Sequence, residues 1–288
     1  MADFADFQFK VKQNWCPGCG DFAVQAAMQK ALAESGAEPK NTVVVSGIGC
    51  SGRLSGYVYA YGFHGTHGRS LPIAQGVKMG NRDLTVIACG GDGDGFAIGI
   101  GHTVHAMKRN MDMTYIVMDN HVYGLTKGQV SPRSDQGFRT KTSPNGSIEP
   151  PVPATELALS AGAGFVAQGF SRDLKELTNL ITQGILHKGF SFINVFSPCV
   201  TFNKVNTYDW YAEKIKSLQS IEGYDPSDRG QAMKVLIENQ GLVTGLIYQN
   251  TGRMDYQKLI PGFDTKPLSA TVTKPEPDIF EKLLDEFR

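Results

Sequence analysis

Short apolar runs recur along most of the chain, separated by longer stretches in which apolar residues return every three or four positions. The short runs are apolar at consecutive positions and too brief for helices, so they fit strands that are buried on both faces of a sheet. We predict such strands at residues 42–49, 84–91, 114–120, 164–170 and 190–197.

The longer stretches have the periodicity of amphipathic helices. They lie at residues 21–36, 72–80, 95–110, 154–163 and 172–189. Because a strand, a crossover helix and the next strand form a parallel pair, their alternation predicts an α/β fold. We expect a mostly parallel sheet with helices on both faces.

The last part of the chain has a different pattern. After Cys199 come two further amphipathic patterns and a strand at 241–249, and a polar tail begins at about Asn250. We therefore divide the chain into a domain at 1–205 and a C-terminal extension at 206–288. The extension is expected to pack on the same domain or on a partner subunit.

Composition excludes few functions, but it bears on whether the cysteines form disulfides. Basic and acidic residues balance at 28 each and 41% of the residues are hydrophobic, so charge gives no reason to expect a nucleic acid or a membrane as partner. No apolar run approaches the length of a membrane span, and the start "MADFADFQFK" is unlike a secretory signal. We expect a cytoplasmic protein, in which reducing conditions disfavour structural disulfides.

Glycine-rich segments follow several of the predicted strands directly. "GIGC", "CGGDGDG", "DNHVYGLT" and "SPC" each begin where a strand ends. Ligands of parallel sheets bind beyond the carboxyl ends of the strands, so these segments are predicted to share one edge. The stretch 128–153 is rich in Pro, Gly and Ser, which predicts a long functional or interface loop.

The segment "CGGDGDG" places Asp92 and Asp94 among glycines, between a strand and a helix. Exposed amides at a helix start attract phosphate, whereas a carboxylate repels it unless a cation lies between them. A magnesium diphosphate fits both features, and magnesium needs further oxygen ligands. Asn120, at the end of the next strand, is a candidate. The alternatives are a tight glycine turn for "GDG" and a turn or cap residue for Asn120.

This spacing resembles the diphosphate-binding motif of thiamine diphosphate enzymes. The resemblance implies that Asp92, Asn120 and the backbone carbonyl of Val122 are magnesium ligands. His102 and His105, on the helix after the motif, receive no role.

Four of the five cysteines lie in segments predicted to meet. Cys16 and Cys19 form a C-x-x-C pair, and Cys50 and Cys199 each follow a strand end. The close pair alone is compatible with a disulfide, a zinc site, a redox dithiol or an iron–sulfur cluster. Four converging thiolates fit zinc or a 4Fe–4S cluster, although structural zinc sites commonly use two close pairs. Cys89 lies within an apolar strand and is predicted to be a small buried hydrophobic residue.

Six motifs, read together, resemble the β subunit of 2-oxoacid:ferredoxin oxidoreductases over roughly residues 10–205. They are "WCPGCG", "GIGCSGR", "HGTHGR", "GGDGDG", "DNHVYGLTKGQ" and "SPC". The resemblance implies a thiamine diphosphate and iron–sulfur domain whose 4Fe–4S cluster is held by Cys16, Cys19, Cys50 and Cys199. It implies that thiamine diphosphate is surrounded by Ile48, Gly49, Cys50, Ser51, His67, Gly93, Asp94, Gly124 and Leu125.

The implied reaction is the oxidative decarboxylation of a 2-oxoacid to acyl-CoA and CO2, with electrons passing through the cluster to ferredoxin. It is reversible in principle. The chain has room for one α/β domain, so the glutamate that thiamine enzymes place against the aminopyrimidine is expected on an α subunit. An αβ heterodimer or an (αβ)2 assembly follows from this.

The substrate is harder to predict. Arg53 stands where the resemblance places a specificity residue, and a guanidinium suits a second carboxylate, which favours 2-oxoglutarate over pyruvate. A surface or interface arginine is the alternative. His67 is predicted to assist proton transfer or only to contact the cofactor, and Lys127 to meet an anionic substrate or only its own loop.

Two other classes of function are also compatible with the sequence. The first is a thiamine diphosphate enzyme without redox chemistry, with zinc at the cysteines. The second is a non-catalytic electron-transfer or scaffold subunit.

Overall fold

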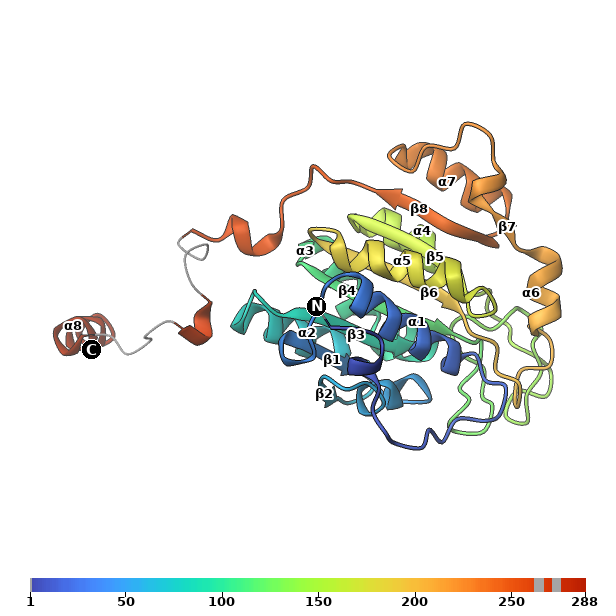
Figure 1. Cartoon of the computed structure of the whole chain (residues 1–288), viewed down its shortest axis with the longest axis horizontal. Helices are drawn as coiled ribbons and strands as arrows, with labels where there is room; N and C mark the ends of the chain where they lie inside the picture. Colours follow the sequence, from blue (N-terminus) through green and yellow to red (C-terminus); the bar gives the residue numbers. More distant parts are fainter. Residues whose placement is uncertain (1, 262–266, 271–275) are drawn as a thin grey trace.

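A computed structural model describes residues 2–261, 267–270 and 276–288 of the protein. Its centre is an eight-stranded sheet in the order β2-β1-β3-β4-β6-β5-β8-β7 (Figure 1). The strands are β1 (Thr42–Ser46), β2 (Tyr61–His64), β3 (Thr85–Gly91), β4 (Met113–Asp119), β5 (Phe165–Phe170), β6 (Phe190–Phe196), β7 (Lys216–Ser217) and β8 (Val243–Gln249). Strands β1 to β6 are parallel, and β8 joins β5 in antiparallel fashion.

Helices cover both faces of this sheet, as predicted. The helices of the described chain are α1 (Asp21–Glu34), α2 (Ser70–Gly80), α3 (Ile100–Arg109), α4 (Ala154–Ala161), α5 (Leu174–Leu186), α6 (Tyr208–Lys214), α7 (Arg229–Glu238) and α8 (Pro277–Asp285). Helices α1 and α5 pack together on one face, and α2, α3, α4 and α7 cover the other. The prediction of an α/β fold is confirmed.

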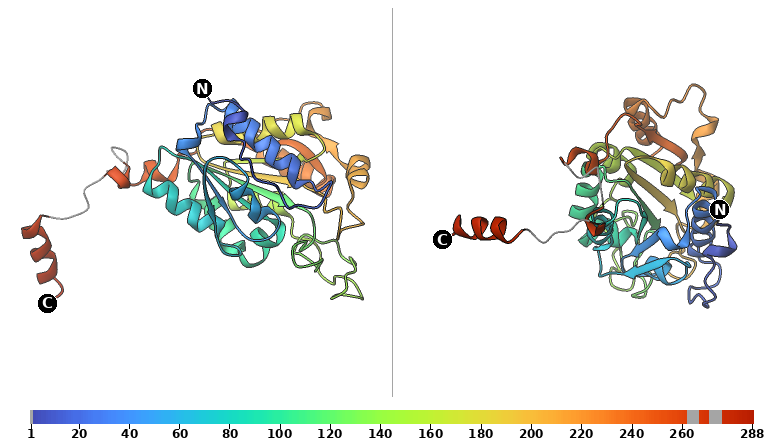
Figure 2. Two further views of the ribbon diagram at one scale, coloured as in Figure 1. Left: turned by 60° about the horizontal axis from the view of Figure 1, so that its bottom comes forward. Right: turned by 60° about the vertical axis from the view of Figure 1, so that its left-hand side comes forward.

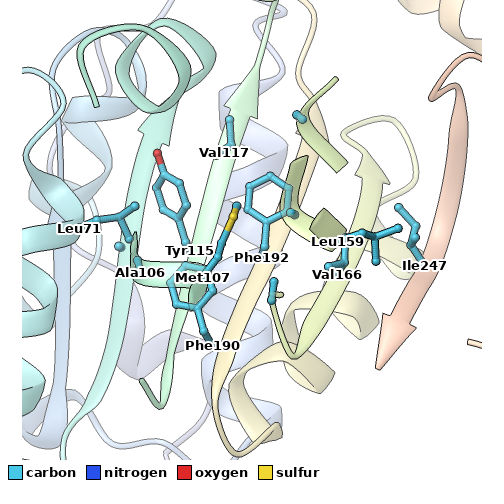
Figure 3. Close-up of a cluster of buried hydrophobic side chains, with 14 of the residues drawn as sticks. Leu71, Ala106, Met107, Tyr115, Val117, Leu159, Val166, Phe190, Phe192 and Ile247 are labelled. Atoms are coloured by element: carbon cyan, nitrogen blue, oxygen red, sulfur yellow. The ribbon is translucent and has the colours of Figure 1, made fainter. Parts of the chain in front are cut away.

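Each face of the sheet has its own hydrophobic core, because successive side chains of a strand point in opposite directions. Along β4, Tyr115 and Val117 join the core on the α3 side, where Phe190, Phe192 and Met107 meet them (Figure 3). Their neighbours Ile116 and Met118 join the opposite core, under α1 and α5. Burial on both faces explains why β4 is apolar at consecutive positions.

Most predicted boundaries differ from the structure by a few residues, and two of the differences have a clear structural reason. Strand β1 ends at Ser46 rather than residue 49, because the following loop turns away from the sheet and Gly49 has a φ of +105°. The helix predicted over 95–110 begins as a π-helical turn, Asp94–Ile98, and continues as α3 after Gly99. A Cβ atom on Gly99 would lie 2.3 Å from the carbonyl oxygen of Asp94 and 3.0 Å from the Cα of Gly68, so this break is tightly packed.

Strands β2 and β7 were not predicted. All residues of β2 are exposed at the sheet edge, so "YGFH" carries no buried apolar run. Strand β7 has only two residues, too few to give a pattern.

The polar tail predicted from Asn250 contains short helical segments. The 3-10 helix Tyr256–Leu259 packs near the start of β4, where the amide of Tyr256 donates to the carbonyl of Asn110. Helix α8 buries none of its residues and stands apart from the sheet in both views of Figure 2. Residues 262–266 and 271–275 of this tail lie outside the described ranges.

Candidate functional site

A cavity of about 560 Å³ opens at the carboxyl ends of the central strands. Its lining comes mainly from the loops that follow β1, β2, β3 and β4, so the predicted edge of the sheet is where these segments meet. The lining includes all residues predicted to contact thiamine diphosphate or magnesium: Ile48, Gly49, Cys50, Ser51, His67, Asp92, Gly93, Asp94, Asn120, Val122, Gly124 and Leu125.

Asp94 connects several of the loops that line the cavity. Its Oδ1 accepts hydrogen bonds from the backbone amides of Ile48 at 3.2 Å and Gly68 at 2.7 Å, and it lies 2.7 Å from Nδ1 of His67. A Cβ atom on Gly47 would lie 1.7 Å from the other carboxylate oxygen, so only glycine fits there. Asp94 therefore joins the loops after β1 and β2 to its own turn.

His67 is oriented by this contact. Since Nδ1 faces the carboxylate of Asp94, its other ring nitrogen, Nε2, is the one left for the cavity. In the neutral tautomer that donates from Nδ1, Nε2 is a proton acceptor. The ring of Tyr123 lies edge-on at 6.1 Å, and the Tyr123 hydroxyl donates to the carbonyl of Gly93.

Asp92 has the surroundings of a carboxylate that needs a cation. It is buried, and its Oδ2 accepts a hydrogen bond from Ser131 Oγ at 2.5 Å. Burial, together with the nearby negative charge of Asp119, raises the pKa of Asp92 above its ordinary value. A divalent cation in the cavity would offset both effects, so Asp92 fits a magnesium ligand.

Asn120 and Val122 line the same cavity. The Asn120 side chain also makes a local turn, because its Oδ1 accepts a hydrogen bond from the amide of Val122 at 3.1 Å. The backbone of Asn120 is held in turn by the side-chain amide of Asn203, which donates to its carbonyl. The turn interpretation of Asn120 and its placement at the cavity are therefore compatible.

Behind these residues lies a buried ionic network that the sequence did not reveal. Asp119 Oδ2 pairs with Arg133 Nε at 2.9 Å and accepts from Asn194, while its Oδ1 lies 3.5 Å from His121 Nε2. Burial opposes the charged form of Asp119, but Arg133 and His121 outweigh it and hold its pKa below the ordinary value. Asp135 completes the network at 3.7 Å from His121 Nδ1.

The four predicted cluster cysteines come from the N-terminal loop and from the ends of β1 and β6. A Cβ atom on Gly124 would lie 3.6 Å from the Sγ atoms of both Cys50 and Cys199, so these two sulfur atoms flank the same piece of backbone. Cys16 is exposed and is joined to Cys19 by a backbone hydrogen bond of 3.0 Å.

Burial and neighbouring acidic groups raise the pKa values of two of these cysteines. Burial, then Asp21, raises the pKa of Cys50 to about 12, and the charges of Cys199 and Cys16 add to the shift. The pKa of Cys19 is raised by burial first, and then by Asp21, Cys50 and Cys199. Thiolates at these positions would repel one another, and positively charged iron or zinc would remove that repulsion.

The described residues contain no group of three or more His, Cys, Asp or Glu side chains arranged to hold a single metal ion. All five cysteines are free thiols, and Cys89 is fully buried in the sheet, as its apolar context predicts.

The two residues predicted to meet the substrate lie outside the cavity lining. Arg53 is exposed on the 3-10 helix Ser51–Gly56, and Lys127 is exposed with a φ of +80°. His102 is hydrogen-bonded to Arg69 at 2.6 Å on the surface. Conversely, Tyr123, Gln129 and Ser131 take part in the site without having been predicted. Gln129 and Ser131 lie at the start of the irregular stretch 128–153, where no periodicity marks individual side chains.

Within the residues that the structure describes, no helix has both the length and the apolar composition that a membrane span requires.

Comparison with known proteins adds independent information. The model of the thiamine pyrophosphate enzyme C-terminal TPP binding domain matches residues 47–195, and that of the C-terminal region of the pyruvate ferredoxin oxidoreductase beta subunit matches 199–265. A 2-oxoacid:ferredoxin oxidoreductase subunit beta of Sulfolobus sp is 41% identical over 265 residues, which cover 88% of this chain and 85% of that protein.

Two further relatives carry names that specify 2-oxoglutarate. A 2-oxoglutarate synthase subunit KorB of Archaeoglobus fulgidus is 38% identical, covering 82% of this chain and 91% of that protein. The solved 2-oxoglutarate:ferredoxin oxidoreductase from Magnetococcus marinus, with 2-oxoglutarate, coenzyme A and succinyl-CoA bound, superposes with a TM-score of 0.86. It is 40% identical and the match covers 90% of this chain and 88% of that one. The chain thus belongs to the β subunits of the 2-oxoacid:ferredoxin oxidoreductases, with the thiamine diphosphate-binding domain of that enzyme family.

Proposed function

We propose that this β subunit, joined to an α subunit, oxidatively decarboxylates 2-oxoglutarate to succinyl-CoA and CO2 and passes the electrons through a 4Fe–4S cluster to ferredoxin. Thiamine diphosphate with Mg²⁺ would occupy the cavity, and Cys16, Cys19, Cys50 and Cys199 would hold the cluster. Bound thiamine diphosphate supplies the electron sink that decarboxylation of a 2-oxoacid requires.

The proposal depends on one observation above all. Cys50 lines the cavity and also lies with Cys199 beside Gly124. A cofactor in this cavity and a cluster at these sulfur atoms would therefore be immediate neighbours. Such closeness serves the transfer of single electrons from one group to the other and has no purpose in a decarboxylase without redox chemistry.

The residues of this chain would divide the remaining tasks. Asp92, Asn120 and the Val122 carbonyl would hold the magnesium, and Asp94 keeps the surrounding loops in register. His67 would accept or return a proton at Nε2, since Nδ1 is engaged by Asp94. Apolar residues such as Val122 and Met118 would help to exclude water from the reacting atoms.

Iron content and colour test the cluster. The α–β complex, purified without oxygen, is expected to be brown, to contain about four irons per β subunit, and to bleach when 2-oxoglutarate and coenzyme A are added. Cys50→Ala should remove most of the iron, whereas Cys89→Ala should leave the colour unchanged because Cys89 is buried in the sheet. A colourless complex that contains zinc would support the thiamine enzyme without redox chemistry. Colour that substrate does not bleach would support an electron-transfer or scaffold subunit.

The choice of 2-oxoglutarate rests on the names of the relatives and on Arg53. The guanidinium of Arg53 is exposed one helical turn from Cys50, where closure by a partner would determine what it meets. We expect Arg53→Ala to raise the KM for 2-oxoglutarate about tenfold or more while that for pyruvate changes little, since only 2-oxoglutarate has a second carboxylate to lose. An equal change in both KM values would rule out Arg53 as the specificity residue, and pyruvate would become the alternative substrate.

A further inference from the structure

The C-x-x-C loop lies at the surface, in a segment that meets another exposed segment distant in sequence. In Figure 1 the dark-blue segment before α1 and the orange segment before α6 come together at one end of the sheet. Two hydrogen bonds join them: the Tyr208 hydroxyl, at the start of α6, donates to the carbonyl of Gly18, and the amide of Gly20 donates to the carbonyl of Pro198 at 3.4 Å. We call the exposed residues of these segments the cluster-side surface: 9–12, 16–18, Phe202, Lys204 and Val205.

Cations and apolar side chains alternate on this surface. Lys10 and Lys12 flank Val11, and Lys204 lies between Phe202 and Val205. The exposed fractions of Phe9, Val11, Phe202 and Val205 lie between 37% and 49%, high for large apolar side chains. Cys16 is exposed as well.

The lysines of this surface have no acidic partner within the described part of the chain. The ammonium of Lys204 donates to the carbonyl of Val200, and Lys10 and Lys12 form no ion pair. Asp209, an exposed carboxylate on the neighbouring helix α6, is paired with Arg172 at 3.3 Å. Asp21, next to the C-x-x-C loop, is fully buried. The surface therefore carries a local positive charge although the chain as a whole is neutral.

We infer that the cluster-side surface docks a small acidic protein that carries one electron at a time, a ferredoxin in the present family. The inference rests on the proposed function, because it requires the cluster at the four cysteines. The carrier would accept one electron from a cluster held by the four cysteines, so the carrier would be reduced and the cluster oxidised without any bond or proton being transferred.

The chemistry of the surface matches such a partner. Electron-transfer complexes bury small interfaces and dissociate quickly, and complementary charge contributes more to their association rate than to their strength. Lys12 is four residues from Cys16, which limits their Cα separation to about 14 Å, well within one such interface. The carrier would dock over the cysteine nearest to solvent, so the electron would cross the least protein.

Kinetics with two acceptors test the inference. We would compare the α–β complex carrying Lys10→Glu, Lys12→Glu and Lys204→Glu with the unmodified complex, using an acidic ferredoxin and methyl viologen in turn. The substitutions should lower kcat/KM for ferredoxin by about tenfold or more, because they remove electrostatic steering. They should leave methyl viologen reduction within about twofold, since this small cation needs no docked protein surface. Added salt should slow ferredoxin reduction in the unmodified complex and have less effect in the variant.

A matched control changes charge by the same amount at the other end of the sheet. Lys108, Lys188 and Lys258 are exposed near the amino end of β4 and β6, and their replacement by Glu should not affect ferredoxin kinetics. An equal loss in both variants, or an equal loss with both acceptors, would overturn the assignment. Failure of the unmodified complex to reduce methyl viologen with 2-oxoacid and coenzyme A would instead refute the proposed function.

Cross-linking tests the surface without any substitution. Carbodiimide joins lysines to carboxylates that are in contact, so the unmodified complex and ferredoxin should link through Lys10, Lys12 or Lys204. Links confined to other lysines would overturn the inference even if the variants behaved as expected.

Discussion

At the residue scale, the cavity depends on a few side chains that join loops from different strands. Asp94 holds the loops after β1 and β2 through the amides of Ile48 and Gly68. These two hydrogen bonds join Asp94 to residues that are 46 and 26 positions away in the sequence. Because the carboxylate is buried and charge-assisted hydrogen bonds are strong, small steric changes beside it should lower the stability of the fold.

Gly47→Ala is expected to destabilise the chain by about 1–3 kcal/mol, the usual cost of overpacking. The new methyl group would displace the Asp94 carboxylate and break its hydrogen bonds to the loops. Chemical denaturation measures the change. Gly76→Ala is the control: it lies within α2, no atom stands within 4 Å of the added methyl, and stability should rise by about 0.5–1 kcal/mol. Equal effects of the two substitutions would contradict the role of Asp94.

Burial of His187 should make the folding stability depend on pH. Burial lowers its pKa below the ordinary value, and its Nε2 is buried without a hydrogen-bond partner. As pH falls through about 6.5, the unfolded chain takes up a proton at this position before the folded chain does. His187 should therefore contribute a loss of folding stability between pH 7 and pH 5, and His187→Gln should remove that contribution.

Denaturation curves at the two pH values, for the unmodified chain and for His187→Gln, measure this difference. The exposed His105 on α3 provides the control substitution, His105→Gln. An identical pH response of the unmodified chain and His187→Gln would show that burial of His187 has no such consequence.

At the element scale, the irregular segment 128–153 is part of the site because buried charges attach it to the sheet. Arg133 reaches from this segment to Asp119 at the end of β4 and donates to the carbonyl of Val152 at 2.6 Å. Ser131 donates to Asp92, and Ser134 donates to the carbonyl of His121. The segment lacks regular structure, yet its side chains bind Asp92 itself and the two neighbours of Asn120, which are Asp119 and His121.

Arg133→Met is expected to lower the free energy of unfolding by about 3–5 kcal/mol, because it leaves the buried Asp119 without its cation. Limited proteolysis should then cut within 128–153 sooner than in the unmodified chain. Arg139→Met, in the same segment but exposed, should change stability by no more than about 0.5 kcal/mol. Similar stability of the two variants would mean that the ion pair does not anchor the segment.

At the scale of the whole molecule, apolar side chains at the mouth of the cavity are exposed. Ile48 and Leu125, which line it, are 39% and 53% exposed, and Ile98 is 55% exposed. Exposed apolar residues around a cavity mark a surface that another protein covers. The division at residue 205 and the packing of the extension on this domain or on a partner remain predictions, although β8 pairs with β5 and so joins the extension to the main sheet.

The isolated chain is therefore expected to bind thiamine diphosphate weakly and to turn over no 2-oxoacid. Addition of the α subunit should tighten binding and restore activity, because we expect the partner to close the cavity and to supply the glutamate that contacts the aminopyrimidine. Calorimetric titration with thiamine diphosphate and Mg²⁺, and methyl viologen reduction, measure the two effects. Measurable turnover by this chain alone would contradict the prediction.

The sequence by itself determined the alternation of strands and helices and the edge of the sheet where the motifs meet. These features follow from short-range periodicity and from the rule that parallel strands end on one side, so β1, β3, β4, β5 and β6 were predictable. Only the tertiary structure decided that Asp94 joins the loops, that Ser131 supports Asp92, and that Arg133 reaches Asp119. Those contacts link residues far apart in the chain, whose side chains carry no local signal of their partners. The exposed strand β2 escaped prediction for a related reason, since its place is determined by pairing with β1 rather than by buried apolar residues.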